Sequence, residues 1–331
     1  MHRTLTAGLA ALILGLCLAS LTLGPAPISA ATATRALVQD LGPASVIVRE
    51  IRLPRTVLAV LIGWIFGLTG AALQGLLRNP LADTAVFGAP QAAALGAVLV
   101  LYFGLVGALS WALPAAAILG ALASIALVVM VAGRETTIVV LVLSGLAVGS
   151  LAGAATSLAI SLSPNPFAVT EIVFWLLGSL EDRSSVHVLL AAPFIVLASA
   201  LLLLAAPGLR ALALGEETAA SLGVRVGRLR LMVVVAAAIG TGASVAVAGS
   251  IGFVGLVAPH LVRPLVAHDP ARALVPAGLA GAALLLAADC AVRVIPSGAE
   301  VKIGVLTALL GVPFFLWIIA RRKADLADIP A

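Results

Sequence analysis

The residues best able to do chemistry in this chain are few and lie far apart. His260 and His268 could ligate a metal, but no cysteine or carboxylate cluster surrounds them in the sequence, so we expect no metal site. Cys17 and Cys290 each sit inside an apolar run, which favours small buried side chains over a disulfide. Since no serine–histidine or histidine–aspartate set suggests a reaction centre, we expect no catalytic residues.

Charged residues at the ends of apolar runs are more informative. Asp289 and Arg293 lie four residues apart, so on a helix they share a face and can pair, which is a simpler interpretation than a proton relay. Arg52 and Arg55, three residues apart, precede another apolar run. Their planar guanidinium groups suit carboxylate recognition, although arginines near a membrane surface also extend toward water without any partner.

The composition indicates the environment in which these residues are held. Of the 331 residues, 62% are hydrophobic and only 10% are charged, whereas a soluble domain carries about 25% charged residues. A lipid bilayer is therefore the expected solvent. The lysines, Lys302 and Lys323, follow no phosphate-binding glycine loop, so any ATP-driven process needs a separate ATPase chain.

Hydropathy predicts an all-α transmembrane chain, a single transmembrane domain over 1–331 with an inner loop at 207–228. The first apolar run ends near a small-residue stretch at 28–31, which resembles a signal peptide, but we expect an uncleaved helix. Glycines at 249 and 252 define the boundary between the seventh and eighth runs. The ten predicted spans are 5–23, 54–77, 90–106, 110–132, 137–159, 187–206, 229–249, 250–266, 272–294 and 302–320.

The basic residues predict the orientation. If the N-terminus is cytoplasmic, 12 of the 19 lysines and arginines fall on the inside and 7 on the outside. Because basic residues favour the cytoplasmic side, both termini are expected to be cytoplasmic.

Besides the RLPR sequence at 52–55, five further stretches follow one another along the chain. They are GAALQGLLRNPLAD (70–83), FWLLGSL (174–180), LGEETAASLGV (214–224), GSIGFVGLVAPHLVR (249–263) and GVLTALLGVPFF (304–315). From about Ile51 to Arg322 the chain thereby resembles the permease family of ABC importers for iron–siderophore complexes, haem and cobalamin (FecCD type).

The resemblance implies a bacterial inner-membrane permease with ten transmembrane helices, working as a dimer, commonly a homodimer, with the translocation path between the subunits. Two ATPase subunits would bind on the cytoplasmic side and carry the ATP and Mg, and a periplasmic substrate-binding protein would dock outside. The chain itself would bind no cofactor and no nucleic acid. The expected cargo is a ferric siderophore, with haem and cobalamin as alternatives.

The resemblance also implies roles for particular residues. Arg52, Arg55 and Arg293 match the arginines that meet carboxylates of the binding protein. Thr136 and Thr137 match the cytoplasmic gate. The residues that match the coupling helix, which rests on the ATPase, are Leu214, Gly215, Glu216, Glu217, Ala219, Leu222 and Gly223; the leucines and Ala219 are expected on one face and the glutamates on another, although a solvated loop helix is the alternative.

Two positions depart from the family pattern. Thr84 and Lys302 stand where the family usually has proline, and Lys302 adds charge near the outer mouth. Two other classes of protein stay open as alternatives. A secondary transporter would need ionisable residues at the bilayer midplane, and a membrane-embedded enzyme would need a reactive constellation; the spans here are nearly free of charge.

Overall fold

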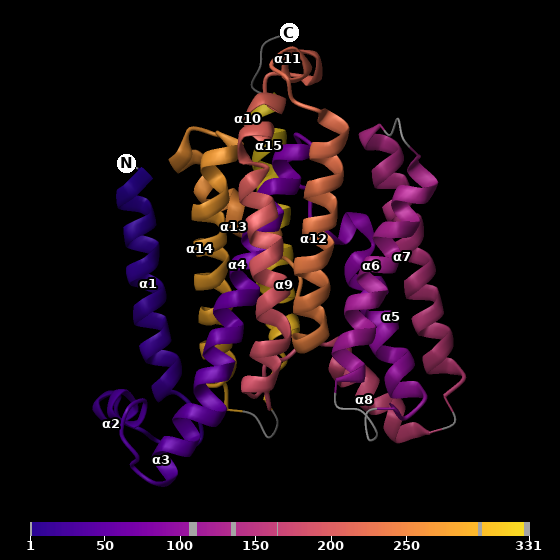
Figure 1. Cartoon of the computed structure of the whole chain (residues 1–331). Coiled ribbons are helices and arrows are strands. Elements are labelled where there is room, and N and C mark those ends of the chain that lie inside the picture. The colour runs from indigo at the N-terminus through magenta and orange to yellow at the C-terminus, as the bar shows by residue number, and fades with distance from the viewer. Residues whose placement is uncertain (1, 106–110, 134–136, 164, 297–299, 328–331) are drawn as a thin grey trace.

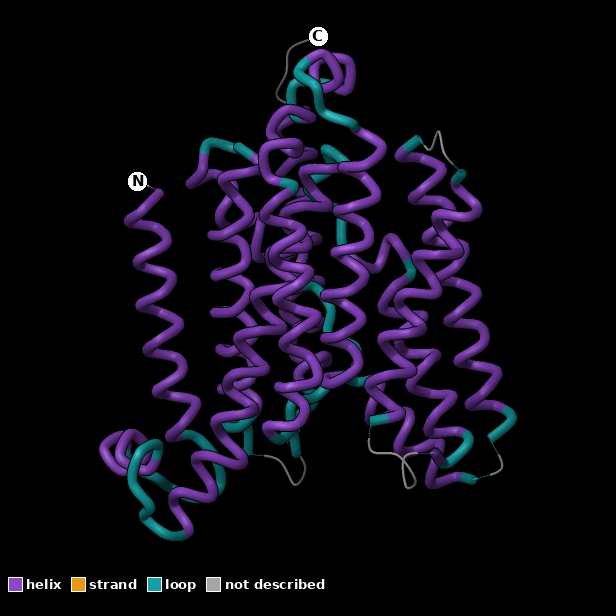
Figure 2. The backbone as a smooth tube through the Cα atoms, viewed as in Figure 1, coloured by secondary structure: helices purple, strands orange, loops and turns teal. Residues whose placement is uncertain are grey.

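The computed structural model describes residues 2–105, 111–133, 137–163, 165–296 and 300–327, and these residues form helices and loops without a strand (Figures 1 and 2). Seven helices within this part of the chain are long and apolar enough to span a bilayer. They are α1 (His2–Thr22), α4 (Leu53–Leu76), α6 (Ala112–Ala132), α7 (Ile138–Ser161), α9 (Ser185–Leu204), α12 (Val226–Ala248) and α14 (Pro270–Val292). The remaining predicted spans correspond to α5 (Ala89–Tyr102), α13 (Val254–Val262) and α15 (Ile303–Ala327), so each of the ten apolar runs contains a helix.

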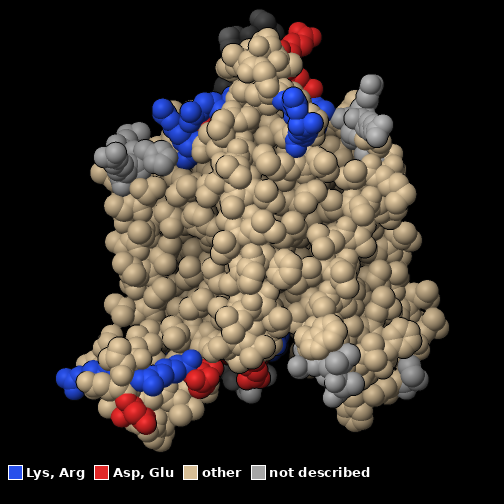
Figure 3. Space-filling model, viewed as in Figure 1, with Lys and Arg blue, Asp and Glu red and all other residues tan. Residues whose placement is uncertain are grey.

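The bundle has two ends that differ in what they carry (Figure 1). One end, called here the α11 end, holds α10 (Ala206–Leu212), α11 (Glu216–Ser221), the start of α1 and the end of α15. The opposite end, the α2 end, holds α2 (Ala30–Ala36), α3 (Pro43–Val46) and α8 (Pro166–Leu176). In Figure 3 the visible charged side chains lie near these two ends, and an uncharged belt separates them.

Helix α4 lies at the centre of the fold and packs on α14, α13, α9 and α12. Small residues permit the close approach: a Cβ at Gly70 would lie only 1.7 Å from the carbonyl oxygen of Gly255 on α13. Such contacts are how helices associate in lipid, where burial of apolar surface alone gives little preference for a neighbouring helix. By contrast, only 11% of the apolar stretch of α1 and 22% of that of α9 are buried within the chain, as expected of helices with one side toward lipid.

Two of the shorter predicted spans begin after a break in the backbone. The span predicted at 250–266 starts four residues too early, because α13 begins only at Val254; it then continues directly as a 3-10 turn, η4 (Arg263–Val266). Gly249 and Phe253 both have positive φ angles, 70° and 66°, which break the helix before α13. Likewise α5 starts within the bundle, after a 3-10 turn, η2 (Thr84–Phe87), capped by Asp83. Thr84, one of the departures from the family pattern, donates its hydroxyl to Asp83 Oδ1 at 3.1 Å.

The polar segment at 24–53 is folded rather than an open loop. It contains α2, α3 and a π-helical turn, η1 (Ile47–Arg52), which runs directly into α4. Ala33, Ala36 and Val48 form a small apolar cluster with Leu21 at the end of α1. This cluster anchors the segment that presents Arg52 and Arg55.

Candidate coupling and docking sites

The α10–α11 segment projects beyond the ends of the long helices (Figure 1). Gly215 and Gly223, with φ angles of 112° and 85°, bracket the short helix α11, as predicted. Its amphipathic face differs from the prediction, because Ala219 is fully buried while Leu214 and Leu222 are 66% and 63% exposed. A six-residue helix is too short to gather all three on one face, so it buries Ala219 and leaves the leucines facing solvent.

Ion pairs hold this segment against the bundle. Glu216 accepts from Arg230 near the start of α12, while Glu217 is exposed. Arg210 on α10 lies 3.0 Å from Asp269, whose carboxylate also caps α14 by accepting from the Ala271 and Arg272 amides. The segment is therefore tied to both α12 and α14, and a force on α11 would act on these two helices.

Thr137 lies in the connection between α6 and α7 at the α11 end. It is exposed, and its hydroxyl accepts from the Val140 amide at 3.4 Å, which caps the start of α7. Thr136, the other residue predicted for the gate, lies outside the described residues. The capping contact explains a hydroxyl at Thr137 without a gating role, so that role stays a prediction.

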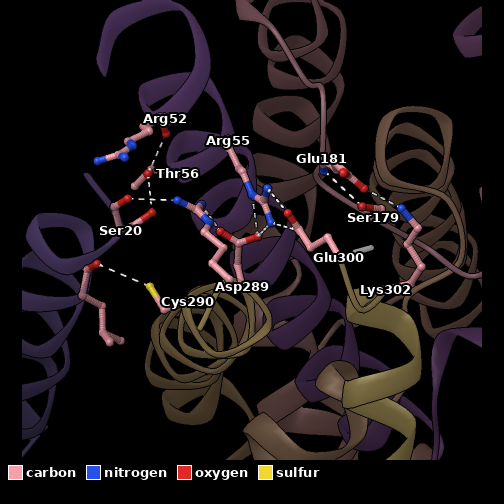
Figure 4. A network of polar contacts seen from close by, with 12 residues as sticks. Ser20, Arg52, Arg55, Thr56, Ser179, Glu181, Asp289, Cys290, Glu300 and Lys302 are labelled. Atoms are coloured by element: carbon pink, nitrogen blue, oxygen red, sulfur yellow. Dashed lines mark hydrogen bonds and ion pairs between the residues drawn. The ribbon is translucent and has the colours of Figure 1, made fainter. Parts of the chain in front are cut away.

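The three predicted docking arginines lie at the α2 end, and Figure 4 shows Arg52 and Arg55 with their surroundings. Arg52 is 4% exposed and donates to the carbonyl oxygens of Leu21, Thr22 and Ala26. Because these carbonyls lie at and just after the end of α1, the guanidinium group satisfies acceptors that the helix leaves unpaired.

Arg55 lies in the most densely charged part of this end. Its Nε donates to Asp289 Oδ1 at 2.8 Å, and its two terminal nitrogens pair with the two carboxylate oxygens of Glu300, one of them at 3.0 Å. Arg293 pairs with the second oxygen of Asp289 and donates to the Ser20 carbonyl at 2.9 Å. The Asp289–Arg293 pairing expected from the spacing is thus confirmed.

The side chain of Asp289 is fully buried, and it accepts from two guanidinium groups. Arg55 and Arg293 together carry two positive charges, and Asp289 and Glu300 carry two negative ones. Burial of charges is costly unless they are paired, so this balance is a condition for the cluster to exist in the fold. The cluster joins the end of α1, the start of α4, the end of α14 and the segment before α15.

Glu300 is the member that the sequence did not reveal. It lies 245 positions from Arg55, and no spacing rule connects residues so far apart. The only available signal was that a buried arginine needs a carboxylate, and Glu300 is one of the few acidic residues close to the end of a span.

A second ion pair lies at the same end. Lys302 Nζ lies 2.5 Å from Glu181 and 5.9 Å from the centre of the Phe174 ring. Nearby, the Ser179 amide donates to the Ala248 carbonyl at 2.8 Å, and a Cβ at Gly304 would lie 2.2 Å from the Leu177 carbonyl oxygen. Three of the recurring stretches, those at 174–180, 249–263 and 304–315, therefore meet in one place.

Comparison with known proteins decides what kind of molecule these features belong to. The FecCD transport family matches residues 11–321. The chain belongs to the FecCD transport family. Its apolar helices and its relatives make it a multi-pass membrane permease of the ABC importer class.

Individual relatives of this family member are similar over most of its length. The hemin transport system permease protein HmuU of Yersinia pestis is 39% identical over 279 residues, 83% of this chain and 83% of that protein. The cobalamin import system permease protein BtuC of Halobacterium salinarum is 39% identical over 282 residues, 85% of this chain and 75% of that protein.

A solved structure gives the same result for the fold. It is described as an inward-facing conformation of a metal-chelate type ABC transporter, and it superposes with a TM-score of 0.87 at 31% identity, covering 96% of this chain and 99% of that one. The permease architecture predicted for this FecCD family member is thereby confirmed.

Proposed function

We propose that this chain is the membrane-spanning subunit of a binding-protein-dependent importer that moves a ferric siderophore complex inward, driven by ATP hydrolysed on a partner chain. Two copies would enclose the translocation path. The chain would bind no cofactor, and ATP and Mg would be held by two ATPase subunits. The observation that carries this proposal is the projecting α10–α11 segment with its exposed leucines on a FecCD family fold.

The exposed leucines support the coupling role. Leu214 and Leu222 flank α11, which projects beyond the ends of the long helices (Figure 1), and the rest of the described chain leaves both side chains largely exposed. Apolar side chains in such a place suit insertion into a groove of a partner protein. The ion pairs from Glu216 to Arg230 and from Arg210 to Asp269 would then pass motion of the ATPase to α12 and α14.

This assignment makes the α11 end cytoplasmic and the α2 end periplasmic. The start of α1 and the end of α15 lie at the α11 end, in agreement with the charge distribution that favours cytoplasmic termini. Thr136 and Thr137 would then lie at the cytoplasmic side, where a gate is needed to close the path after release of cargo.

The periplasmic binding protein would dock at the α2 end. Arg52, Arg55 and Arg293 are engaged within the chain, so carboxylates of the binding protein would share these guanidinium groups rather than find them unpaired. Glu300, whose side chain is 19% exposed, marks the side from which Arg55 can be reached.

The cargo proposal rests on chemistry that the relatives have in common. Hemin and cobalamin, named for two of them, are both bulky metal-centred complexes, and the solved neighbour is described as metal-chelate type. A ferric siderophore is the iron complex of the same size class, and hemin and cobalamin remain the alternatives. A path for such cargo would bind weakly, because the spans offer few ionisable side chains.

The test compares substitutions at α11 with matched substitutions at the opposite end of the chain. We would co-express the chain with its ATPase and binding protein and replace Leu214→Asp/Leu222→Asp; the matched control is Val38→Asp/Leu41→Asp, exposed apolar residues at the opposite end. We expect ATPase copurification to fall at least about tenfold in the first variant only, because charged side chains do not enter an apolar groove. ATP-dependent ferric-siderophore uptake in proteoliposomes should fall with it in that variant.

Three results would contradict parts of the proposal. Uptake that needs a proton or sodium gradient but no ATPase would favour the secondary transporter. Equal losses in both variants would mean that α11 has no special place in coupling. ATP hydrolysis with uptake of hemin or cobalamin, but not of ferric siderophore, would overturn only the cargo.

A further inference from the structure

A cavity of about 480 Å³ lies at the α11 end, next to the coupling segment, between the end of α6 and the starts of α7 and α12. Its inner part is apolar, lined by Val129, Leu141, Leu231 and Val234. These side chains belong to three membrane-spanning helices, so the inner part of the cavity lies within the apolar layer.

The outer part of the cavity is strongly basic. Arg225, Arg228 and Arg230 line it, and none of the other described lining residues is acidic. Arg230 pairs with Glu216, whereas Arg225 and Arg228 are exposed and form no ion pair with the described residues. Within the described part of the chain, these two positive charges at the mouth of the cavity have no ion-pair partner.

The backbone adds to this charge. α12 begins at Val226 with no side-chain cap, so the first amides of a 23-residue helix point toward the same region as the two arginines. The amino end of a helix carries partial positive charge and attracts anions such as phosphate. Side chains and helix dipole thus favour the same kind of ligand.

The combination of the two parts identifies the ligand class. A phosphate group paired with arginines at the end of the membrane spans, joined to apolar chains in a groove below, is the chemistry of an anionic phospholipid. We propose that this cavity binds the headgroup phosphate of an anionic phospholipid, such as phosphatidylglycerol, through Arg225 and Arg228, with acyl chain resting on the apolar inner part.

The proposed lipid site lies next to a residue predicted for the cytoplasmic gate. Gly133 lines the cavity at the end of α6, and Thr137 begins the next helix a few residues later. A bound lipid would therefore lie between the end of α6 and the start of α7, close to Thr137, one of the residues predicted for the gate. The binding itself does not depend on the proposed transport function.

The test measures lipid retention. The detergent-purified full chain would be incubated with phosphatidylglycerol or phosphatidylcholine and examined by native mass spectrometry. We expect native protein to retain phosphatidylglycerol at least tenfold better than phosphatidylcholine, and Arg225→Gln/Arg228→Gln to lose this preference. Both arginines are exposed, and size-exclusion profiles would check that the variant folds.

The matched control removes the same charge elsewhere. Arg78→Gln/Arg272→Gln neutralises two exposed arginines at the same end, outside the cavity, and should keep the preference for phosphatidylglycerol. An equal loss in this control would overturn the proposal, because any cationic surface would then suffice.

Two further outcomes would overturn it in different ways. If inorganic phosphate at equal concentration displaces phosphatidylglycerol completely, the site recognises phosphate alone and the apolar part plays no role. If Arg225→Gln/Arg228→Gln retains phosphatidylglycerol but loses the copurifying ATPase, the arginines serve an acidic partner surface instead of lipid.

Discussion

The two ends of the bundle handle their charges in opposite ways. At the α2 end, Arg55, Arg293 and Asp289 are buried and satisfy one another (Figure 4). At the α11 end, Arg225 and Arg228 are exposed, and Leu214 and Leu222 face solvent as well. The first arrangement holds helix ends together, and the second leaves side chains available to other molecules.

The two ends thus show two different roles for a charged residue near a membrane surface. A buried arginine with two carboxylates is first a structural element, because loss of either partner leaves an uncompensated charge. An exposed arginine contributes little to stability, so its role is expected to be binding to another molecule, a lipid or a protein. Substitutions at the two ends should therefore change different measurements.

The largest effect is expected for Asp289→Ala. This change leaves Arg55 without one of its two carboxylates and Arg293 without its only ion pair among the described residues, so the free energy of unfolding should fall by about 3–5 kcal/mol. Thermal unfolding of the detergent-purified chain measures the loss. Adding Arg293→Met should restore part of it, because the second change removes the charge that the first leaves unpaired.

The control for this prediction lies at the other end. Glu217→Ala removes an exposed carboxylate from α11 and should change the free energy of unfolding by no more than about 0.5 kcal/mol. If Asp289→Ala is as mild as Glu217→Ala, the buried cluster does not stabilise the fold, and the contrast between the ends fails.

A smaller effect is expected for the pair between Lys302 and Glu181. The two side chains are 20% and 37% exposed, and the ammonium group also lies over Phe174. A double-mutant cycle with Lys302→Met and Glu181→Gln should give a coupling free energy of about 0.5–1 kcal/mol. A coupling near zero would show that Lys302, although it replaces a proline of the family pattern, does not link the segment before α15 to the α8–α9 loop.

Hydropathy and charge predicted much of this fold. Each of the ten apolar runs contains a helix, because length and apolarity are local properties that a single sequence displays. The break between α12 and α13 lies at Gly249 and Gly252, as predicted, but α13 begins later than predicted, at Val254. The positive φ at Phe253 that delays it depends on contacts made after folding; a Cβ at Gly311 would collide with the Phe253 side chain. The short helices within 24–53 carried too few apolar residues to be recognised.

The sites were less predictable than the fold. Asp289 and Arg293 were paired from their spacing, since both lie on one helix. Glu300 was missed because its partner, Arg55, is distant in the sequence. The short helix between Gly215 and Gly223 was located correctly, but the direction of the flanking leucines was not, because which side of a short helix is buried depends on α10 and α12 rather than on the helix itself.

The smallest effect should come from Arg210 and Asp269 at the α11 end. The Arg210 side chain is 56% exposed, so water and salt weaken its attraction to Asp269 at 3.0 Å. A double-mutant cycle with Arg210→Gln and Asp269→Asn should give a coupling below about 0.5 kcal/mol, falling further in high salt. Asparagine is chosen because it still caps α14, so the cycle isolates the ion pair. A salt-insensitive coupling as large as the effect of Asp289→Ala would mean that this end, too, is held by its charges, and the contrast between the two ends would fail.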